Sequence, residues 1–222
     1  RQKPIKKEYY SIIFLVASLV VITLVYQIRP FLDDSQFFWI SFPSFVIVPG
    51  TLIIFSIIVT VKLYKQKHFQ SKAFLCFTLG VSFWFTAEQI WALYQYVYDV
   101  DPFPSMADIF YITSYPFFIT FLLISIKPIQ KSISKKVWLF AFTLAFAFMV
   151  PLLLLNFYAS DQSEGGLDLF SKSIVFTYPI LSSLQLVPAI IGIMFLTKKE
   201  ASYSWMLLLF GFFVFIISDI FY

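Results

Sequence analysis

A few polar side chains interrupt otherwise apolar stretches, and these are the residues that could do chemistry. Glu88 lies in the run "FWFTAEQIWALYQY" (83–96), where helical spacing puts Trp84, Trp91 and Gln95 on its face. A carboxylate among aromatic rings can bind a small cation, accept hydrogen bonds from a polar ligand or exchange a proton. We therefore predict a ligand or proton site at these four residues. The alternative is a buried polar contact that holds two helices together.

The sequence offers no basic partner for Glu88, because no lysine or arginine lies inside an apolar segment. The carboxyl must then be protonated or accept hydrogen bonds from nearby donors. Those donors are polar and aromatic side chains of the same stretch, or Gln185 from a later one.

Catalytic and metal-binding patterns are missing from the sequence. The single histidine, His68, and the single cysteine, Cys76, cannot form a recognisable zinc or haem site, a nucleophile–base pair or an HExxH motif. The last apolar stretch contains no lysine that could hold retinal as a Schiff base. We predict no enzyme activity, no metal, no cofactor, no retinal and no nucleic-acid partner.

The composition indicates which elements must position Glu88. Of the 222 residues, 60% are hydrophobic and 13% charged, whereas soluble domains contain about 25% charged residues. A bilayer core is crossed by roughly 20 apolar residues in a helix. Seven stretches qualify, namely 9–28, 37–61, 73–98, 109–126, 137–158, 173–196 and 203–222. We predict an all-α, polytopic transmembrane helix bundle that forms one domain over residues 1–222.

Basic residues are concentrated in alternate connections between these stretches. Of the 16 lysines and arginines, all but two lie in four places. These are the segment before 9–28, the connection from 37–61 to 73–98, the connection from 109–126 to 137–158, and the connection from 173–196 to 203–222. The other connections contain Arg29, Lys172 and eight acidic residues. Because basic loops stay in the cytoplasm, we predict a multi-pass protein of the cell membrane with a cytoplasmic N-terminus. Binding of anionic lipid or a cytoplasmic partner is the alternative explanation of these lysines.

Two of the apolar stretches resemble each other, which indicates an internal repeat. In "LGVSFWFTAEQIW" (79–91) and "FGFFVFIISDIFY" (210–222), a glycine precedes an acid by eight residues and an aromatic follows the acid by three. Asp219 is thereby a second candidate site residue, with snorkelling to water as its alternative. Internal repeats are common in membrane folds. We expect the chain to continue beyond Tyr222 into an eighth helix.

The acidic connection "DVDPFPSMADIFYITSYP" (99–116) contains a helix-start pattern. Pro104 precedes Ser105, which can cap the next helix, and Asp108 then lies in the first turn, where the helix dipole favours an anion. Capping alone would explain Ser105 and Asp108.

Together these residues resemble a known class of membrane region. Gly80 and Glu88, followed by a Pro-Ser-x-Ala-Asp-x-x-Tyr element (Pro104, Ser105, Ala107, Asp108, Tyr111), are similar to the polytopic regions that precede bacterial diguanylate cyclase domains or stand alone in archaeal and bacterial membrane proteins. The chain departs from that pattern in having Glu88 where aspartate is more usual, and in showing no cyclase domain. The resemblance implies a sensory input role.

Three functions therefore stay open. The first is a membrane sensory or regulatory domain that transmits a signal through helix packing. The second is a structural or accessory subunit of a larger membrane complex, with a protein partner in the membrane or at its cytoplasmic face. The third is a transporter of a small solute, coupled to protons through Glu88.

Overall fold

A computed structural model describes residues 20, 24, 27–162, 167–196 and 208–216. All secondary structure in these residues is helical, which confirms the all-α prediction. The elements are η1 (Arg29–Phe31), α2 (Asp34–Lys65), α3 (Ser71–Ala92), the π-helix η2 (Leu93–Val97), α4 (Met106–Ile126), η3 (Lys127–Ser132), α5 (Lys135–Gln162) and α6 (Leu169–Leu196). Residues 208–216 are also helical.

Five helices of the described chain are long and apolar enough to cross a bilayer. They are Val46–Lys65, Ser71–Val97, Met106–Ile126, Lys135–Tyr158 and Leu169–Met194. Five of the seven predicted stretches thus correspond to α2–α6, and the chain is a helical membrane protein by length and composition. Stretch 9–28 lies almost entirely outside the described residues, and 203–222 is described only at 208–216.

Contacts divide the chain into two compact units, Arg1–Pro49 and Gly50–Tyr222. In the first unit, Asp33 begins α2 with a reciprocal capping box. Its carboxylate accepts a hydrogen bond from the Gln36 backbone N–H at 2.7 Å, and the Gln36 side chain accepts one from the Asp33 N–H at 3.3 Å. Two otherwise unpaired donors at the helix start are thereby satisfied. That the whole chain forms one transmembrane domain stays a prediction.

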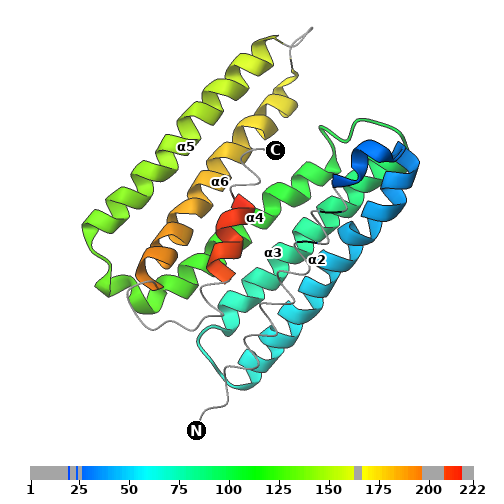
Figure 1. The fold of residues 1–222 in the computed structure, drawn as a ribbon. Coiled ribbons are helices and arrows are strands. Elements are labelled where there is room, and N and C mark those ends of the chain that lie inside the picture. The colour runs from blue at the N-terminus through cyan, green and yellow to red at the C-terminus, as the bar shows by residue number, and fades with distance from the viewer. Residues whose placement is uncertain (1–19, 21–23, 25–26, 163–166, 197–207, 217–222) are drawn as a thin grey trace. The chain divides into compact units, whose positions relative to one another are not determined.

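In the second unit, α6 is the central helix. Figure 1 shows α3 beside α4, and α6 between α4 and α5. Neighbours along the chain run in opposite directions, so α4 and α6 are parallel. Residues buried inside the protein make up 61% of the apolar span of α6 but only 11% of that of α5. Side chains of α6 are therefore best placed to bridge its neighbours, whereas most of α5 is available to lipid.

Phenylalanine rings form the core where α3, α4 and 208–216 meet. The ring of Phe212 lies 5.7 Å from Phe77, 5.5 Å from Phe118 and 5.5 Å from Phe121, measured between centroids. These separations are typical of favourable aromatic pairs. The helix at 208–216 is thereby held against α3 and α4.

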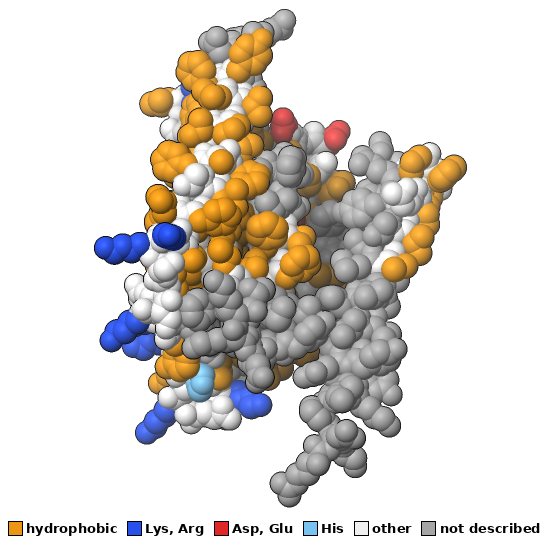
Figure 2. Space-filling model, turned by 60° about the vertical axis from the view of Figure 1, so that its left-hand side comes forward, with side chains coloured by type: hydrophobic (Ala, Val, Ile, Leu, Met, Phe, Trp, Pro, Cys, Tyr) orange, Lys and Arg blue, Asp and Glu red, His pale blue; other side chains and the backbone are white. Residues whose placement is uncertain are grey.

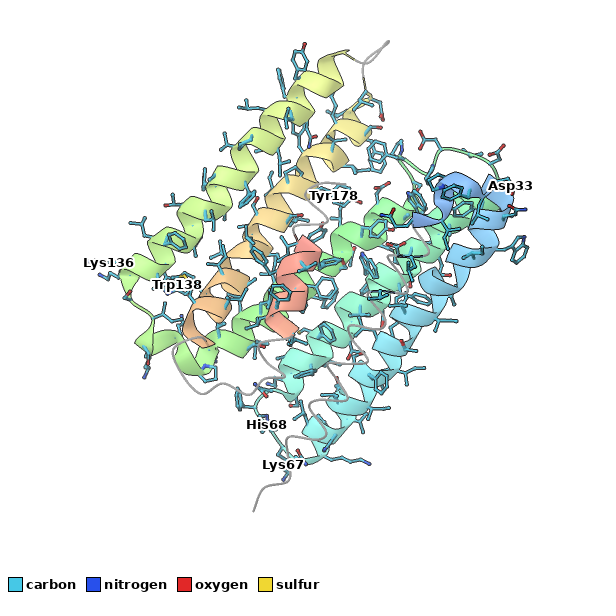
Figure 3. The ribbon with its side chains drawn as sticks, in the orientation of Figure 1. Asp33, Lys67, His68, Lys136, Trp138 and Tyr178 are labelled. Carbon is cyan, nitrogen blue, oxygen red and sulfur yellow. The ribbon has the colours of Figure 1, made fainter. Side chains whose placement is uncertain are left out.

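The second unit has a basic end and an acidic end. Lysines lie in the last turn of α2, in the loop after it, in the first turn of α3, and in and just after η3 between α4 and α5. Asp99, Asp101 and Asp168 lie at the opposite helix ends. Figure 2 shows most Lys and Arg side chains in the lower half of the molecule and the Asp and Glu side chains above them. Figure 3 places Lys67, His68 and Lys136 at the basic end.

The C-terminus of α2 ends in a left-handed residue that is not glycine. Lys67 has φ 51°, its N–H donates to the Tyr64 carbonyl at 3.0 Å, and the His68 N–H donates to the Leu63 carbonyl at 3.0 Å. These two bonds form a Schellman motif, in which the left-handed position is usually glycine because a Cβ is disfavoured there.

We predict that Lys67→Gly stabilises the protein. Removing the Cβ relieves left-handed strain, which outweighs the greater freedom of glycine in the unfolded chain, for a net gain of about 0.5–1 kcal/mol. The free energy of unfolding in detergent would measure it. Lys65→Gly, inside the last helical turn, is the matched control and should lose about 1 kcal/mol. A loss at both positions would contradict the strain argument.

Candidate functional site

The N-terminus of α4 is fixed by the capping pair expected from the sequence. Ser105 is the N-cap, with extended backbone, and its hydroxyl accepts a hydrogen bond from the Ala107 N–H at 3.1 Å. Asp108 Oδ2 accepts one from the Ser105 N–H at 2.8 Å. Pro104 follows Phe103 in a cis peptide bond immediately before the cap. The side chains of Ser105 and Asp108 therefore accept hydrogen bonds from backbone N–H groups that the helix start leaves unpaired.

Asp108 also joins two helices, which capping alone does not explain. Its second oxygen, Oδ1, accepts a hydrogen bond of 2.8 Å from the hydroxyl of Tyr178 on α6. Asp108 is 6% exposed, so its carboxylate is almost fully enclosed by protein. Hydrogen bonds to a charged acceptor are about twice as strong as neutral ones. Asp108 thus connects the start of α4 to the central helix.

Glu88 joins a second pair of helices. Its carboxylate is half-buried on α3 and is hydrogen-bonded to the side chain of Tyr111 on α4. The two sequence patterns that contain Glu88 and Tyr111 therefore meet in space. Trp84, one turn before Glu88, packs edge-to-face on Phe215 with ring centroids 5.7 Å apart.

A third polar pair lies deeper in the protein. The hydroxyls of Tyr115 on α4 and Ser182 on α6 share a hydrogen bond of 3.2 Å, and both residues are buried. The ring of Tyr115 also lies 6.3 Å from that of Tyr178. We call the three hydrogen-bonded pairs the polar cluster; its members are Glu88, Tyr111, Asp108, Tyr178, Tyr115 and Ser182. The cluster links α3, α4 and α6.

The remaining predicted site residues lie in different surroundings. Trp91 is half-buried on α3, one turn after Glu88. Asp219 lies outside the described residues. Gln185 is fully buried on α6, and neither polar atom of its side chain has a hydrogen-bond partner among the described residues. It is therefore not hydrogen-bonded to Glu88, for which the sequence made it a candidate donor.

Gln95 lies in a π-helix that the sequence pattern did not indicate. The Tyr98 N–H donates to the Leu93 carbonyl at 3.1 Å, five residues back, and the Val100 N–H donates to the Tyr94 carbonyl at 3.1 Å. The seven-residue spacing that put Gln95 on the face of Glu88 assumed α-helical geometry, which ends at Ala92. Single π-turns inside helices frequently occur at functional sites.

The start of α6, at the acidic end of the unit, is capped by Asp168. Its carboxylate accepts hydrogen bonds from the hydroxyl of Ser171 and from the Ser171 backbone N–H, the latter at 3.2 Å. These bonds favour the charged form, so the pKa of Asp168 is held below its usual range, with the Ser171 side chain the largest cause.

A pH dependence follows from the Asp168 cap. The pKa of Asp168 is lower in the folded than in the unfolded chain. The stabilisation by the cap is therefore fully present at pH values above the unfolded-state pKa, and it is lost as the pH falls through the folded-state pKa. The carboxyl carbon-13 shift of Asp168 should titrate with a lower midpoint in wild type than in Ser171→Ala. Equal midpoints would show that the Ser171 hydroxyl does not stabilise the carboxylate.

The polar cluster suits binding or proton exchange. It presents two carboxylates, each hydrogen-bonded to a tyrosine of a neighbouring helix, and among the described residues no group of three His, Cys, Asp or Glu could hold a metal ion. A ligand or a proton that competes for these oxygens would break contacts between helices. Comparisons with protein-family models, curated proteins and solved structures found no match to this chain.

Proposed function

We propose that the chain is an integral membrane sensory or regulatory domain whose signal is a change in the packing of α3, α4 and α6. One observation carries this proposal: the Asp108–Tyr178 hydrogen bond of 2.8 Å joins the start of α4 to the central helix. A ligand or proton with different affinity for the paired and unpaired states shifts the balance between them. The Glu88–Tyr111 bond extends the same coupling to α3.

The basic end of the unit is the side at which the signal is read. The chain leaves α4 for α5 there, through η3 and its lysines. A shift of α4 against α3 and α6 at the polar cluster would move this connection, because a helix transmits a displacement along its length. The resemblance to sensory membrane regions supports a sensory role.

The proposal includes the finer fold: seven transmembrane helices, an internal repeat and a cytoplasmic N-terminus. The charge difference between the two ends supports the orientation. The two glycines of the repeat have different surroundings, since a Cβ at Gly80 would meet Phe118 at 2.7 Å whereas one at Gly211 would meet nothing within 4 Å. A common origin of the two segments therefore does not require common packing.

Cysteine labelling in intact cells tests the orientation. In a chain with Cys76 replaced by alanine, a cysteine at Asp99 should react with a membrane-impermeant maleimide, whereas one at Lys131 should react only after the cells are opened. Both positions are exposed in the protein. The reverse labelling pattern would show that the orientation is opposite to the proposed one.

Distance measurements between helix ends test the signalling mechanism. Spin labels on cysteines at Lys72 and Lys127 in the Cys76→Ala chain would report the separation of α3 and α4 at the basic end. We expect Asp108→Asn and Glu88→Gln to shift or broaden this distance distribution in nanodiscs, because each weakens a bond between helices at the other end. Asp101→Asn, on an exposed loop acid, is the control. Unchanged distance distributions in both variants would contradict the proposed signalling mechanism and would show that the polar cluster has a structural role only.

A further inference from the structure

A cavity lies at the basic end, away from the polar cluster, where α4 passes into α5. Its volume is about 240 Å³, and its lining residues are Leu123, Ile124, Ile126, Lys127, Gln130 and Trp138. Three of these are apolar residues of the last turn of α4, and Lys127 and Gln130 belong to η3. Trp138, which is labelled in Figure 3 near the start of α5, also lines the cavity.

Several lysines lie around the cavity in the described part of the chain. Lys127, Lys131, Lys135 and Lys136 are all exposed, and no acidic residue occurs between Leu123 and Trp138. No ion pair of these four lysines is found in the described part of the chain. An anion in the cavity would experience the field of all four lysines.

The lining is divided into a polar part and an apolar part, and the division follows the membrane. Lys127 and Gln130 lie just beyond the end of the apolar span Met106–Ile126, where a bilayer crossed by this span would have its headgroups. Leu123, Ile124 and Ile126 lie within that span, where the same bilayer would have its acyl chains. Trp138 is half-buried and stacks on Phe142 with ring centroids 6.0 Å apart. Tryptophan at this depth is typical of the interface between hydrocarbon and water.

We infer that this cavity binds one anionic phospholipid, with its phosphate at Lys127 and Gln130 and the first part of an acyl chain against Ile124, Ile126 and Trp138. An ammonium and an amide donor together suit a phosphodiester oxygen. Basic pockets between transmembrane helices are known to accept anionic headgroups in this way. A soluble phosphate would leave the apolar half of the cavity unused, so the amphipathic lining favours a lipid.

Lipid retention by the full chain tests the site. After purification from mixed phosphatidylglycerol and phosphatidylcholine nanodiscs, native mass spectrometry should show one retained phosphatidylglycerol per chain. Lys127→Gln should lower this retention about fivefold, the effect of about one lysine near an anionic surface. The control is Lys62→Gln, an exposed lysine of α2 that does not line the cavity. An equal loss in both variants would show non-specific charge attraction and overturn the site.

Quenching by brominated lipid gives an independent measurement of position. Phosphatidylglycerol with brominated acyl chains should quench a tryptophan component that disappears in Trp138→Phe and weakens in Lys127→Gln. Brominated phosphatidylcholine should quench that component less. Inorganic phosphate and glycerol 3-phosphate should not reverse the quenching. Reversal by either anion would identify a soluble anion as the occupant. Equal quenching by both lipids would show that the cavity contacts lipid without preference for an anionic headgroup, and would overturn the site.

Discussion

Asp108→Ala is expected to lower the free energy of unfolding by about 3 kcal/mol or more, the largest effect among the cluster residues. The carboxylate accepts 2.8 Å hydrogen bonds from the Ser105 N–H and from the Tyr178 hydroxyl, and it is 6% exposed. Hydrogen bonds to charged groups contribute about 1.5–3 kcal/mol each, and unpaired buried partners add a desolvation penalty. Chemical unfolding in detergent would measure the change.

Three further substitutions separate the two roles of Asp108. Ser105→Ala removes only the cap and should cost about 1 kcal/mol. Tyr178→Phe removes only the bond to α6 and should cost about 1.5–3 kcal/mol. Asp101→Ala, on an exposed loop residue whose carboxylate accepts from the Phe103 N–H at 3.0 Å, should cost less than Asp108→Ala.

A double-mutant cycle between Asp108→Asn and Tyr178→Phe isolates the contact between helices. Asparagine keeps an acceptor for the Ser105 N–H, so the cap is largely retained in both backgrounds. Residues in direct contact give interaction energies of about 0.5–3 kcal/mol, whereas separate sites are additive. Additivity within about 0.5 kcal/mol would mean that the Asp108–Tyr178 bond does not stabilise the packing of α4 on α6.

Helix positions and the Ser105 cap could be predicted from the sequence because both depend on local chemistry. Bilayer thickness sets the length of an apolar run, so α2–α6 follow from composition alone. A cap is decided within four residues, which is why Ser105 and Asp108 could be placed before any tertiary contact was known.

The partners of the site residues could not be predicted because they are decided by packing between distant segments. Tyr178 lies 70 residues after Asp108, and no spacing rule relates them. Tyr111 belongs to a sequence motif, yet its contact with Glu88 depends on the antiparallel packing of α3 and α4. The π-helix at Leu93–Val97 likewise replaced the regular spacing that placed Gln95 on the face of Glu88. In each case tertiary structure decided what local pattern left open.

Gly80 is the position at which the smallest substitution should have the largest effect on core packing. It faces α4, and a Cβ there would lie 2.7 Å from Phe118 Cε1 and 2.8 Å from Cδ1. The ring of Phe118 cannot withdraw easily, because it is 4% exposed and also packs on Phe212 and Phe215, at 5.5 and 5.9 Å. Close approach of two membrane helices is typically made possible by such small residues.

We therefore predict that Gly80→Ala lowers the free energy of unfolding by about 1–3 kcal/mol, the usual cost of overpacking. The sign is informative, because alanine is otherwise favoured over glycine in a helix by about 1 kcal/mol. Gly211→Ala is the matched control: a Cβ there meets nothing within 4 Å, so the change should be neutral or stabilising.

Phe118→Leu tests whether the ring is the obstacle. Alone it should destabilise the core by removing aromatic contacts. In the Gly80→Ala background the smaller side chain also relieves the overlap, so the double variant should be more stable than the sum of the two single changes. If the two changes in the free energy of unfolding are additive, overlap with Phe118 is not the cause of the destabilisation by Gly80→Ala. Stabilisation by Gly80→Ala itself would show that α3 and α4 are not in the close contact that positions Glu88 beside Tyr111.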